Sequence, residues 1–216
     1  MKYAANLAVL ALTTAIAGCS TADPVVYQGL ASAAQLRPDP SDVTGRAPYS
    51  YKTAADWKQY SKVLMELVVY AGSDNQFDKM PDADRKELAN YMHDSFLQKL
   101  KQRFALAKQV GPGTLRVRIT LAGAKATNAL MGPASHLDIA GGVYNTIQAA
   151  RDKQGSMTGS VSYAVEVYDA SAGRLLLSYV AKQYPSALNV GASFGALQAS
   201  RIAIDKGADD LLTRLR

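Results

Sequence analysis

The strictest constraint on the fold is the run from Leu115 to Leu121, in which apolar and polar residues alternate without a fault. A period of two places all the apolar side chains on one face of a β-strand. The residues between them, Arg116, Arg118 and Thr120, then face water. The run therefore predicts a strand with one buried face, and that face needs a second layer of structure packed against it.

Three further segments are typical of strands. Residues 62–70 are apolar at both odd and even positions, which predicts a strand that is covered on both faces and central in its sheet. Residues 160–168 and 175–181 alternate again, and Asp169–Gly173 between them has the composition of a hairpin loop. The last two strands are therefore expected to pair antiparallel.

Apolar residues at helical spacing predict two helices. The first follows Pro81, has a capping-box pattern at Asp84–Glu87 and runs to about Phe104. The second covers residues 196–216. The predicted order is strand, helix, strand, an excursion over 123–159, strand, strand, helix. This order predicts an α+β fold with a mainly antiparallel sheet and two main helices on one face. The expected buried stripes are Leu88, Met92, Phe96, Leu100 and Phe104, and then Leu197, Ile204, Leu211 and Leu215.

The N-terminus has the layout of an export signal. Lys2 precedes a short uncharged apolar segment, Leu7–Ile16, which is too short to span a bilayer as a mature helix. The segment ends in Ile16-Ala17-Gly18-Cys19, which looks like a bacterial lipobox. Cys19 is the only cysteine of the chain, so it has no disulfide partner within the chain.

This resemblance implies cleavage before Cys19 and a lipid anchor on it. The sulfur would carry diacylglycerol and the new amino terminus a further acyl chain such as palmitate, and two or more chains anchor a protein stably. Ser20 stands where an aspartate would retain such a protein at the inner membrane. The expected location is therefore the outer membrane, facing the periplasm.

The expected domain organisation has three parts. Residues 1–18 are the signal peptide, residues 19–60 the lipidated N-terminus and tether, and residues 61–216 a single α+β domain. Four prolines and weak apolar periodicity predict that the second part is a tether and wrapping segment rather than a packed element. The prolines are Pro24, Pro38, Pro40 and Pro48.

Composition limits the partners. Loss of residues 1–18, whose only charge is Lys2, lowers the formal net charge from +6 to +5. The basic residues are scattered along the sequence, and those at the end of the first helix are expected from the helix macrodipole alone. We therefore expect solvated basic faces and no nucleic-acid site.

The chain resembles the DUF3313 family, proteobacterial lipoproteins that share a domain of unknown function. The resemblance covers nearly the whole mature chain, and its motifs are turn and strand positions rather than a catalytic signature. It implies a fold and a compartment but no activity. The motifs are Leu36–Pro40, Tyr60–Val63, Gly111–Val117, Gly159–Val161 and Glu166–Ala170.

Candidate chemical groups are few. His93 and His136 stand alone, which argues against a metal site built on either. The acidic stretch Asp74–Asp84 lacks the central glycine and final glutamate of a calcium loop. Glu66 and Glu166 lie on different predicted strands, with nothing to join them as an acid/base pair. We expect no catalytic residues, no metal and no cofactor.

The leading hypothesis is a non-enzymatic envelope lipoprotein that binds a protein partner or stabilises an envelope complex. One alternative is a subunit of a secretion or transport channel. The predicted element order is similar to that of the curli secretion channel subunit, and the 123–159 excursion would then insert. A cell-wall or lipid hydrolase is the other alternative.

Overall fold

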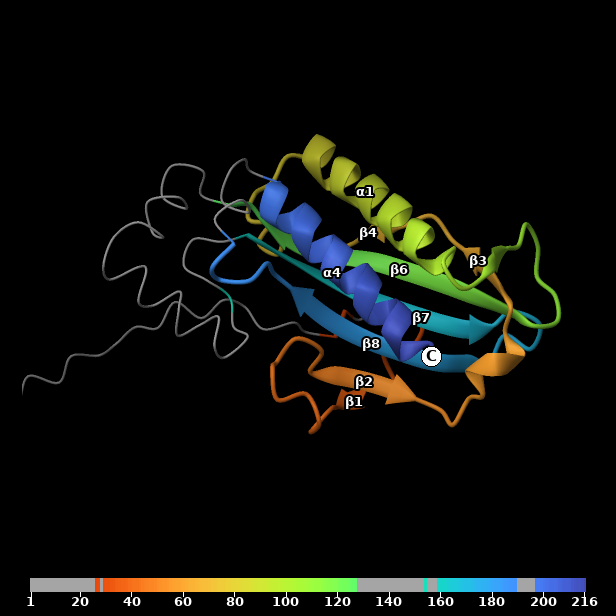
Figure 1. The fold of residues 1–216 in the computed structure, drawn as a ribbon. Helices are drawn as coiled ribbons and strands as arrows, with labels where there is room; N and C mark the ends of the chain where they lie inside the picture. The colour runs from red at the N-terminus through yellow and green to blue at the C-terminus, as the bar shows by residue number, and fades with distance from the viewer. Residues whose placement is uncertain (1–25, 28, 128–153, 155–158, 190–196) are drawn as a thin grey trace, which may run out of the picture.

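The computed structural model describes residues 26–27, 29–127, 154, 159–189 and 197–216. Within them, eight strands form one sheet, and two long helices lie side by side across one of its faces (Figure 1). The strand order is β1-β2-β8-β7-β6-β3-β5, and β4 pairs with β6. The strands are β1 (Arg37–Pro38), β2 (Tyr49–Lys52), β3 (Lys62–Met65), β4 (Val69–Tyr70), β5 (Ala105–Leu106), β6 (Thr114–Lys125), β7 (Ser160–Asp169) and β8 (Leu175–Gln183). The helices are the 3-10 turn η1 (Trp57–Gln59), α1 (Asp82–Leu100) and α4 (Gln198–Arg214).

The centre of the sheet is the antiparallel set β6, β7 and β8, as the alternating runs predict. All four apolar residues of the run that begins at Leu115 are fully buried beneath the helices. A bulge between Leu121 and Gly123 bends β6. A Cβ on Gly123 would lie 2.7 Å from the Gln76 carbonyl oxygen, so this close approach of two backbones needs glycine.

The two helices cover the same face, which confirms the α+β class with helices on one side. The α1 stripe Leu88, Met92, Phe96 and Leu100 is fully buried. The ends of α1 differ from the expected ones. The helix starts at Asp82 with Pro81 as N-cap and no side-chain cap, because the fixed proline backbone already suits the first turn. It stops at Leu100, and Phe104 is buried from the following turn.

The segment 62–70 does not form the central strand that its sequence predicts. It is broken into β3 and β4, both parallel to β6, and it lies towards one edge of the sheet. Leu67 is 77% exposed and Val69 54% exposed. An apolar pattern on both faces shows which side chains are hydrophobic, but it does not show how many strands lie on either side of the segment. Here the neighbour on the outer side is β5, which has only two residues.

The second face of the sheet is covered by residues 29–36, called the strap below. Leu30 and Leu36 of the strap are buried against Ala164 of β7 and Val180 of β8. The prediction of a tether over 19–60 is therefore wrong from residue 29 onward. From there the chain packs on the sheet and contributes β1 and β2. Its apolar residues are irregularly spaced, so no periodicity marks them. Residues 19–25 lie outside the described residues, as does nearly all of the 123–159 excursion.

Candidate functional site

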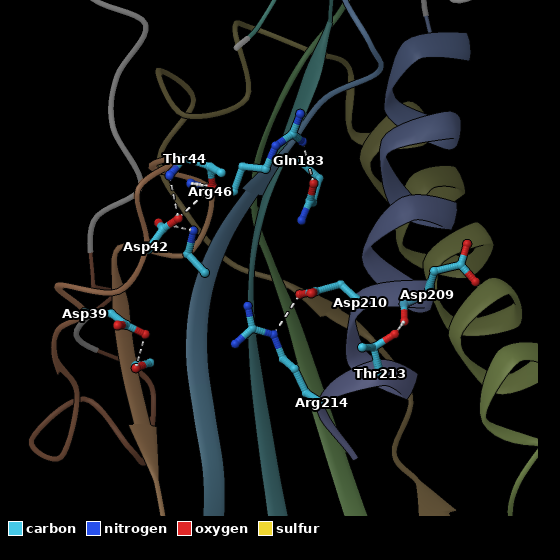
Figure 2. Close-up of polar contacts among 11 residues, drawn as sticks. Asp39, Asp42, Thr44, Arg46, Gln183, Asp209, Asp210, Thr213 and Arg214 are labelled. Atoms are coloured by element: carbon cyan, nitrogen blue, oxygen red, sulfur yellow. Dashed lines mark hydrogen bonds and ion pairs between the residues drawn. The ribbon is translucent and has the colours of Figure 1, made fainter. Parts of the chain in front are cut away.

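A groove of about 390 Å³ lies between the loop 42–47, the end of β8 and the C-terminal half of α4. Figure 2 shows the loop on one side of β8 and the α4 side chains on the other. The groove joins parts of the chain that are more than 130 residues apart, so no local motif marks it. Its charged lining residues are Asp42, Arg46, Lys206, Asp209, Asp210 and Arg214.

Asp42 shapes the loop side of the groove. Its Oδ1 accepts hydrogen bonds from the backbone N–H and the hydroxyl of Thr44, at 3.1 and 2.6 Å, and its Oδ2 accepts from the Ala47 N–H at 2.7 Å. Burial by itself would raise the pKa of Asp42, but these hydrogen bonds outweigh it and the pKa is lowered. The carboxylate is therefore ionised and holds the turn.

Arg46 ties this loop to the sheet. It is only 6% exposed, and its Nη1 donates to Gln183 Oε1 at 2.8 Å and to the Tyr184 carbonyl oxygen at 3.3 Å. Its guanidinium lies 3.9 Å from the centre of the Tyr184 ring. A buried guanidinium needs such partners, because an unpaired buried charge is strongly unfavourable.

Arg214 forms the opposite wall. Its Nε donates to Asp210 Oδ2 at 2.8 Å, one helical turn earlier (Figure 2). Its guanidinium lies 4.6 Å from the centre of the Tyr179 ring. Burial lowers the pKa of Arg214, but Tyr179 and Asp210 raise it more, and the net shift is upward. Asp209 points to α1 instead, with its Oδ1 2.5 Å from Lys99 Nζ.

The groove offers hydrogen-bond donors and acceptors rather than reactive groups. Among the described residues, no histidine, cysteine or serine lines it. The hydroxyl of Thr213 donates to the Asp209 carbonyl oxygen, and that of Thr44 donates to Asp42. The arrangement can therefore hold a small polar molecule, but the lining contains none of the usual nucleophile–base pairs.

A second polar cluster lies on the face of the sheet under the strap. Glu66 and Glu166, which the sequence does not join as an acid/base pair, are both next to Arg118 of β6. Arg118 Nε is 2.9 Å from Glu66 Oε2, and Arg118 Nη1 is 4.0 Å from Glu166 Oε2. The Glu66 hydrogen bond raises the pKa of Arg118. The two glutamates are thus linked through one ion-pair cluster, because the register of β6 and β7 pairs Arg118 with Glu166.

Glu166 also fixes the strap. It is 1% exposed, and its Oε1 accepts the Ser32 backbone N–H at 2.7 Å. The Ser32 and Ser178 hydroxyls lie 2.7 Å apart beside it. Desolvation and the neighbouring Glu166 raise the pKa of Tyr168 to about 12. This buried carboxylate therefore has a structural partner at each oxygen.

The other candidates from the sequence are dispersed. The lipobox residues Ile16, Ala17, Gly18 and Cys19 lie outside the described residues, as does His136. His93 lies on α1, and its Nδ1 is buried with no hydrogen-bond partner in the described part of the chain. In the acidic stretch, Asp74 pairs with Arg85 at 2.8 Å, and Asp82 accepts from the Tyr70 hydroxyl at 2.6 Å.

The described residues offer neither a cluster of metal ligands nor a helix that could span a membrane. They contain no group of three or more histidine, cysteine, aspartate or glutamate side chains placed to hold a metal ion. In the same residues, no helix has both the length and the hydrophobicity needed to cross a bilayer.

Comparison with known families settles the relationship. The model of DUF3313, described as a protein of unknown function, matches residues 26–211. The chain belongs to the DUF3313 family. The matched region begins with the residues that lead into the strap and ends in α4, so in this protein the DUF3313 domain includes the N-terminal segment that packs on the sheet. None of the curated proteins matches the sequence significantly.

Two solved structures are similar at low identity. One is a dodecamer of a single-substitution variant of PelC from Paraburkholderia phytofirmans, with 13% identity and a TM-score of 0.37 over 73% of this chain and 89% of that one. The other is the PelC dodecamer of the same organism in a second crystal form, with 10% identity and a TM-score of 0.35 over 72% of this chain and 90% of that one.

Proposed function

We propose that this DUF3313 protein is a lipid-anchored protein of the bacterial cell envelope and that its domain is a non-enzymatic binding or complex-stabilising unit. One observation carries the proposal: Ile16-Ala17-Gly18-Cys19 follows a short apolar segment, and Cys19 is the only cysteine. Because Ser20 and not an aspartate follows, the proposal places the protein at the outer membrane, facing the periplasm.

The distance from the anchor to the domain supports a role close to the membrane. Seven steps of the chain lead from Cys19 to Val26, where the described residues begin. Fully extended, they reach about 25 Å. A partner of the domain therefore has to lie at the membrane or within a short distance of it.

The groove supports binding rather than a reaction. Its guanidinium groups have partners within the protein, Gln183 for Arg46 and Asp210 for Arg214. The Arg46 contact ties the loop to β8, and α4 contacts the same strand where the Arg214 guanidinium lies on the Tyr179 ring. A rigid polar groove of this kind suits recognition of a ligand or a peptide side chain, because little ordering is needed when the partner binds.

Metabolic labelling with an alkyne-modified palmitate tests the anchor. The wild-type chain, expressed from its own signal in a Gram-negative bacterium, is expected to incorporate the label and to be shortened by about 18 residues. Cys19→Ser is expected to abolish both the label and the cleavage. Ser20→Ala is the matched control and is expected to retain both. A labelled and shortened Cys19→Ser chain would refute the anchor.

The position of Ser20 gives a separate test of the membrane. Ser20→Asp is expected to move the protein from the outer-membrane fraction to the inner-membrane fraction on a sucrose gradient, while labelling at Cys19 continues. An unchanged distribution would show that the assignment to the outer membrane is wrong, although the anchor itself would stand.

Crosslinking in intact cells tests the binding role. A photoreactive residue in place of Lys206, which lines the groove, is expected to give a discrete adduct, whereas the same residue in place of Lys86 at the start of α1 serves as the control. Absence of any adduct specific to the groove would count against the binding role. An adduct that contains only this chain, with a ring-sized native mass in detergent, would favour the channel-subunit alternative.

A further inference from the structure

The fold gathers basic residues that are scattered in the sequence at one end of the domain, called the basic end below. Figure 1 shows the C-terminal ends of α1 and α4, the turn η1 and the β7–β8 connection at this end. Lys62 pairs with Ala105, Arg103 Nη2 donates to the Trp57 carbonyl oxygen at 2.9 Å, and the Tyr60 hydroxyl donates to Asp169 at 2.9 Å. The basic end consists of Lys58, Lys62, Lys101, Lys108, Arg174 and Arg216.

These six side chains are exposed, and they outnumber the nearby carboxylates of Asp56 and Asp169. In the part of the chain that the structure describes, none of them forms an ion pair. The nearby Asp56 and Asp169 accept hydrogen bonds from the protein, including the backbone N–H groups of Lys58 and Ser171. Arg216 is close enough to Arg103 to lower the pKa of that guanidinium, after the larger effect of burial. The basic end therefore presents a net positive potential.

Exposed aliphatic side chains lie among these cations. Leu106 of β5 is 48% exposed and Val110 is 58% exposed, and Lys108 stands between them in the sequence. Apolar side chains surrounded by lysines match a lipid surface, where lysines meet phosphate groups and aliphatic groups enter the headgroup region. Single-stranded nucleic acid calls instead for exposed aromatic rings, and Trp57 and Tyr60 here are only 6% and 8% exposed.

We propose that the basic end docks on anionic phospholipid headgroups. The proposal rests on the exposed residues of the domain and not on Cys19, so it stands or falls separately from the lipid anchor. If Cys19 is anchored, docking would give the domain a fixed orientation on the bilayer. The groove lined by Arg46 and Arg214 would then lie at a constant height above the bilayer.

The single tryptophan gives a direct measurement, because Trp57 lies at the basic end. The full mature protein is reconstituted with vesicles of phosphatidylcholine, alone or with phosphatidylglycerol, containing a dansyl-labelled lipid. Energy transfer from Trp57 to dansyl is expected to be higher with phosphatidylglycerol and to fall as salt is raised, since salt screens exposed charges. Transfer that is equal in both vesicles at all salt concentrations would overturn the proposal.

Charge reversal supplies the matched control. Lys101→Glu with Lys108→Glu changes the basic end, and Lys79→Glu with Lys86→Glu makes the same change in net charge near the start of α1. The positions 86 and 101 are separated by about 22 Å along the helix. Each basic residue at an anionic surface changes the docking equilibrium about fivefold, so the first pair is expected to weaken docking at least about 25-fold. Equal effects of both pairs would overturn the proposal.

Flotation of the same vesicles separates this proposal from the anchor. An anchored chain floats with either lipid composition, whatever the orientation of the domain. If the chain floats with both lipid compositions but the energy transfer from Trp57 is the same with and without phosphatidylglycerol, docking is refuted and the anchor stands. A chain that fails to float would refute the anchor, and its energy transfer would still measure docking from solution. Circular dichroism of each variant confirms that the fold is retained.

Discussion

Gly207 of α4 lies directly against the buried Tyr163, and Gly207→Ala is expected to destabilise the fold although alanine favours helices. A Cβ on Gly207 would collide with the Tyr163 hydroxyl oxygen and lie 2.9 Å from its Cζ. The Tyr163 ring cannot turn away, because it contacts the rings of Phe96 and Tyr179 edge-on, at centroid distances of 5.7 and 6.5 Å. The new methyl group can be accommodated only if α4 moves away from the sheet.

The magnitude follows from two opposing effects. Alanine in a helix interior is about 1 kcal/mol more favourable than glycine. Overpacking of a filled core costs about 1–3 kcal/mol. Gly207→Ala is therefore expected to lower the free energy of unfolding by up to about 2 kcal/mol. Tyr163→Phe removes the colliding oxygen, and because that hydroxyl has no hydrogen-bond partner among the described residues, its loss is expected to be neutral or stabilising by about 1 kcal/mol.

Urea unfolding of the four chains, followed by circular dichroism, checks the reasoning. In the Tyr163→Phe background, Gly207→Ala is expected to cost less, because the colliding oxygen is gone although the ring carbon at 2.9 Å remains, with a coupling free energy of about 1 kcal/mol between the two sites. If Gly207→Ala costs the same in both backgrounds, the collision with the hydroxyl is not its cause. If it stabilises the wild-type chain, the close packing of α4 on Tyr163 is refuted.

Two further predictions concern carboxylates. Glu166→Ala removes the acceptor of the Ser32 N–H and is expected to cost about 2–3 kcal/mol and to speed proteolysis of the strap. Glu166→Gln keeps an acceptor and is expected to cost less, so equal losses would contradict the role of that hydrogen bond. For Asp169, hydrogen bonds from Ser171 and Ala172 lower the pKa from 3.8 to about 2. Its ionised form therefore stabilises the native state above pH 3.8, and this contribution is lost as the pH falls through about 2. Asp169→Asn should lose less thermal stability than the wild type between these pH values, and an identical loss would contradict the shift.

The parts of the fold that the sequence predicts are those whose packing is periodic. The run from Leu115 and the stripe from Leu88 repeat with the periods of a strand and a helix, and both are buried as expected. The strap has no period, since Leu30 and Leu36 enter the core through turns. Its packing depends on contacts with β7 and β8, which no local pattern contains.

The candidate groove could not be predicted from the sequence, for a related reason. Arg46 becomes buried only because the loop crosses the end of β8 and meets Gln183 there. The link between Glu66 and Glu166 through Arg118 depends on strand register, and a shift of one residue would point Arg118 to the other face. Long-range pairing decides both features, while the lipobox-like pattern that ends at Cys19 is local and visible in the sequence alone.

The strap also determines how the domain carries a mechanical load. A pull on the chain ahead of Val26 reaches the fold through Leu30 and Ser32, which contact β7 and β8 in the middle of the sheet. The load therefore falls on two long strands, each hydrogen-bonded on both sides, and not on an edge strand that could be peeled away. If the chain is anchored through Cys19 as proposed, a pull on the anchor would first have to break the strap contacts at Glu166 and Ser178.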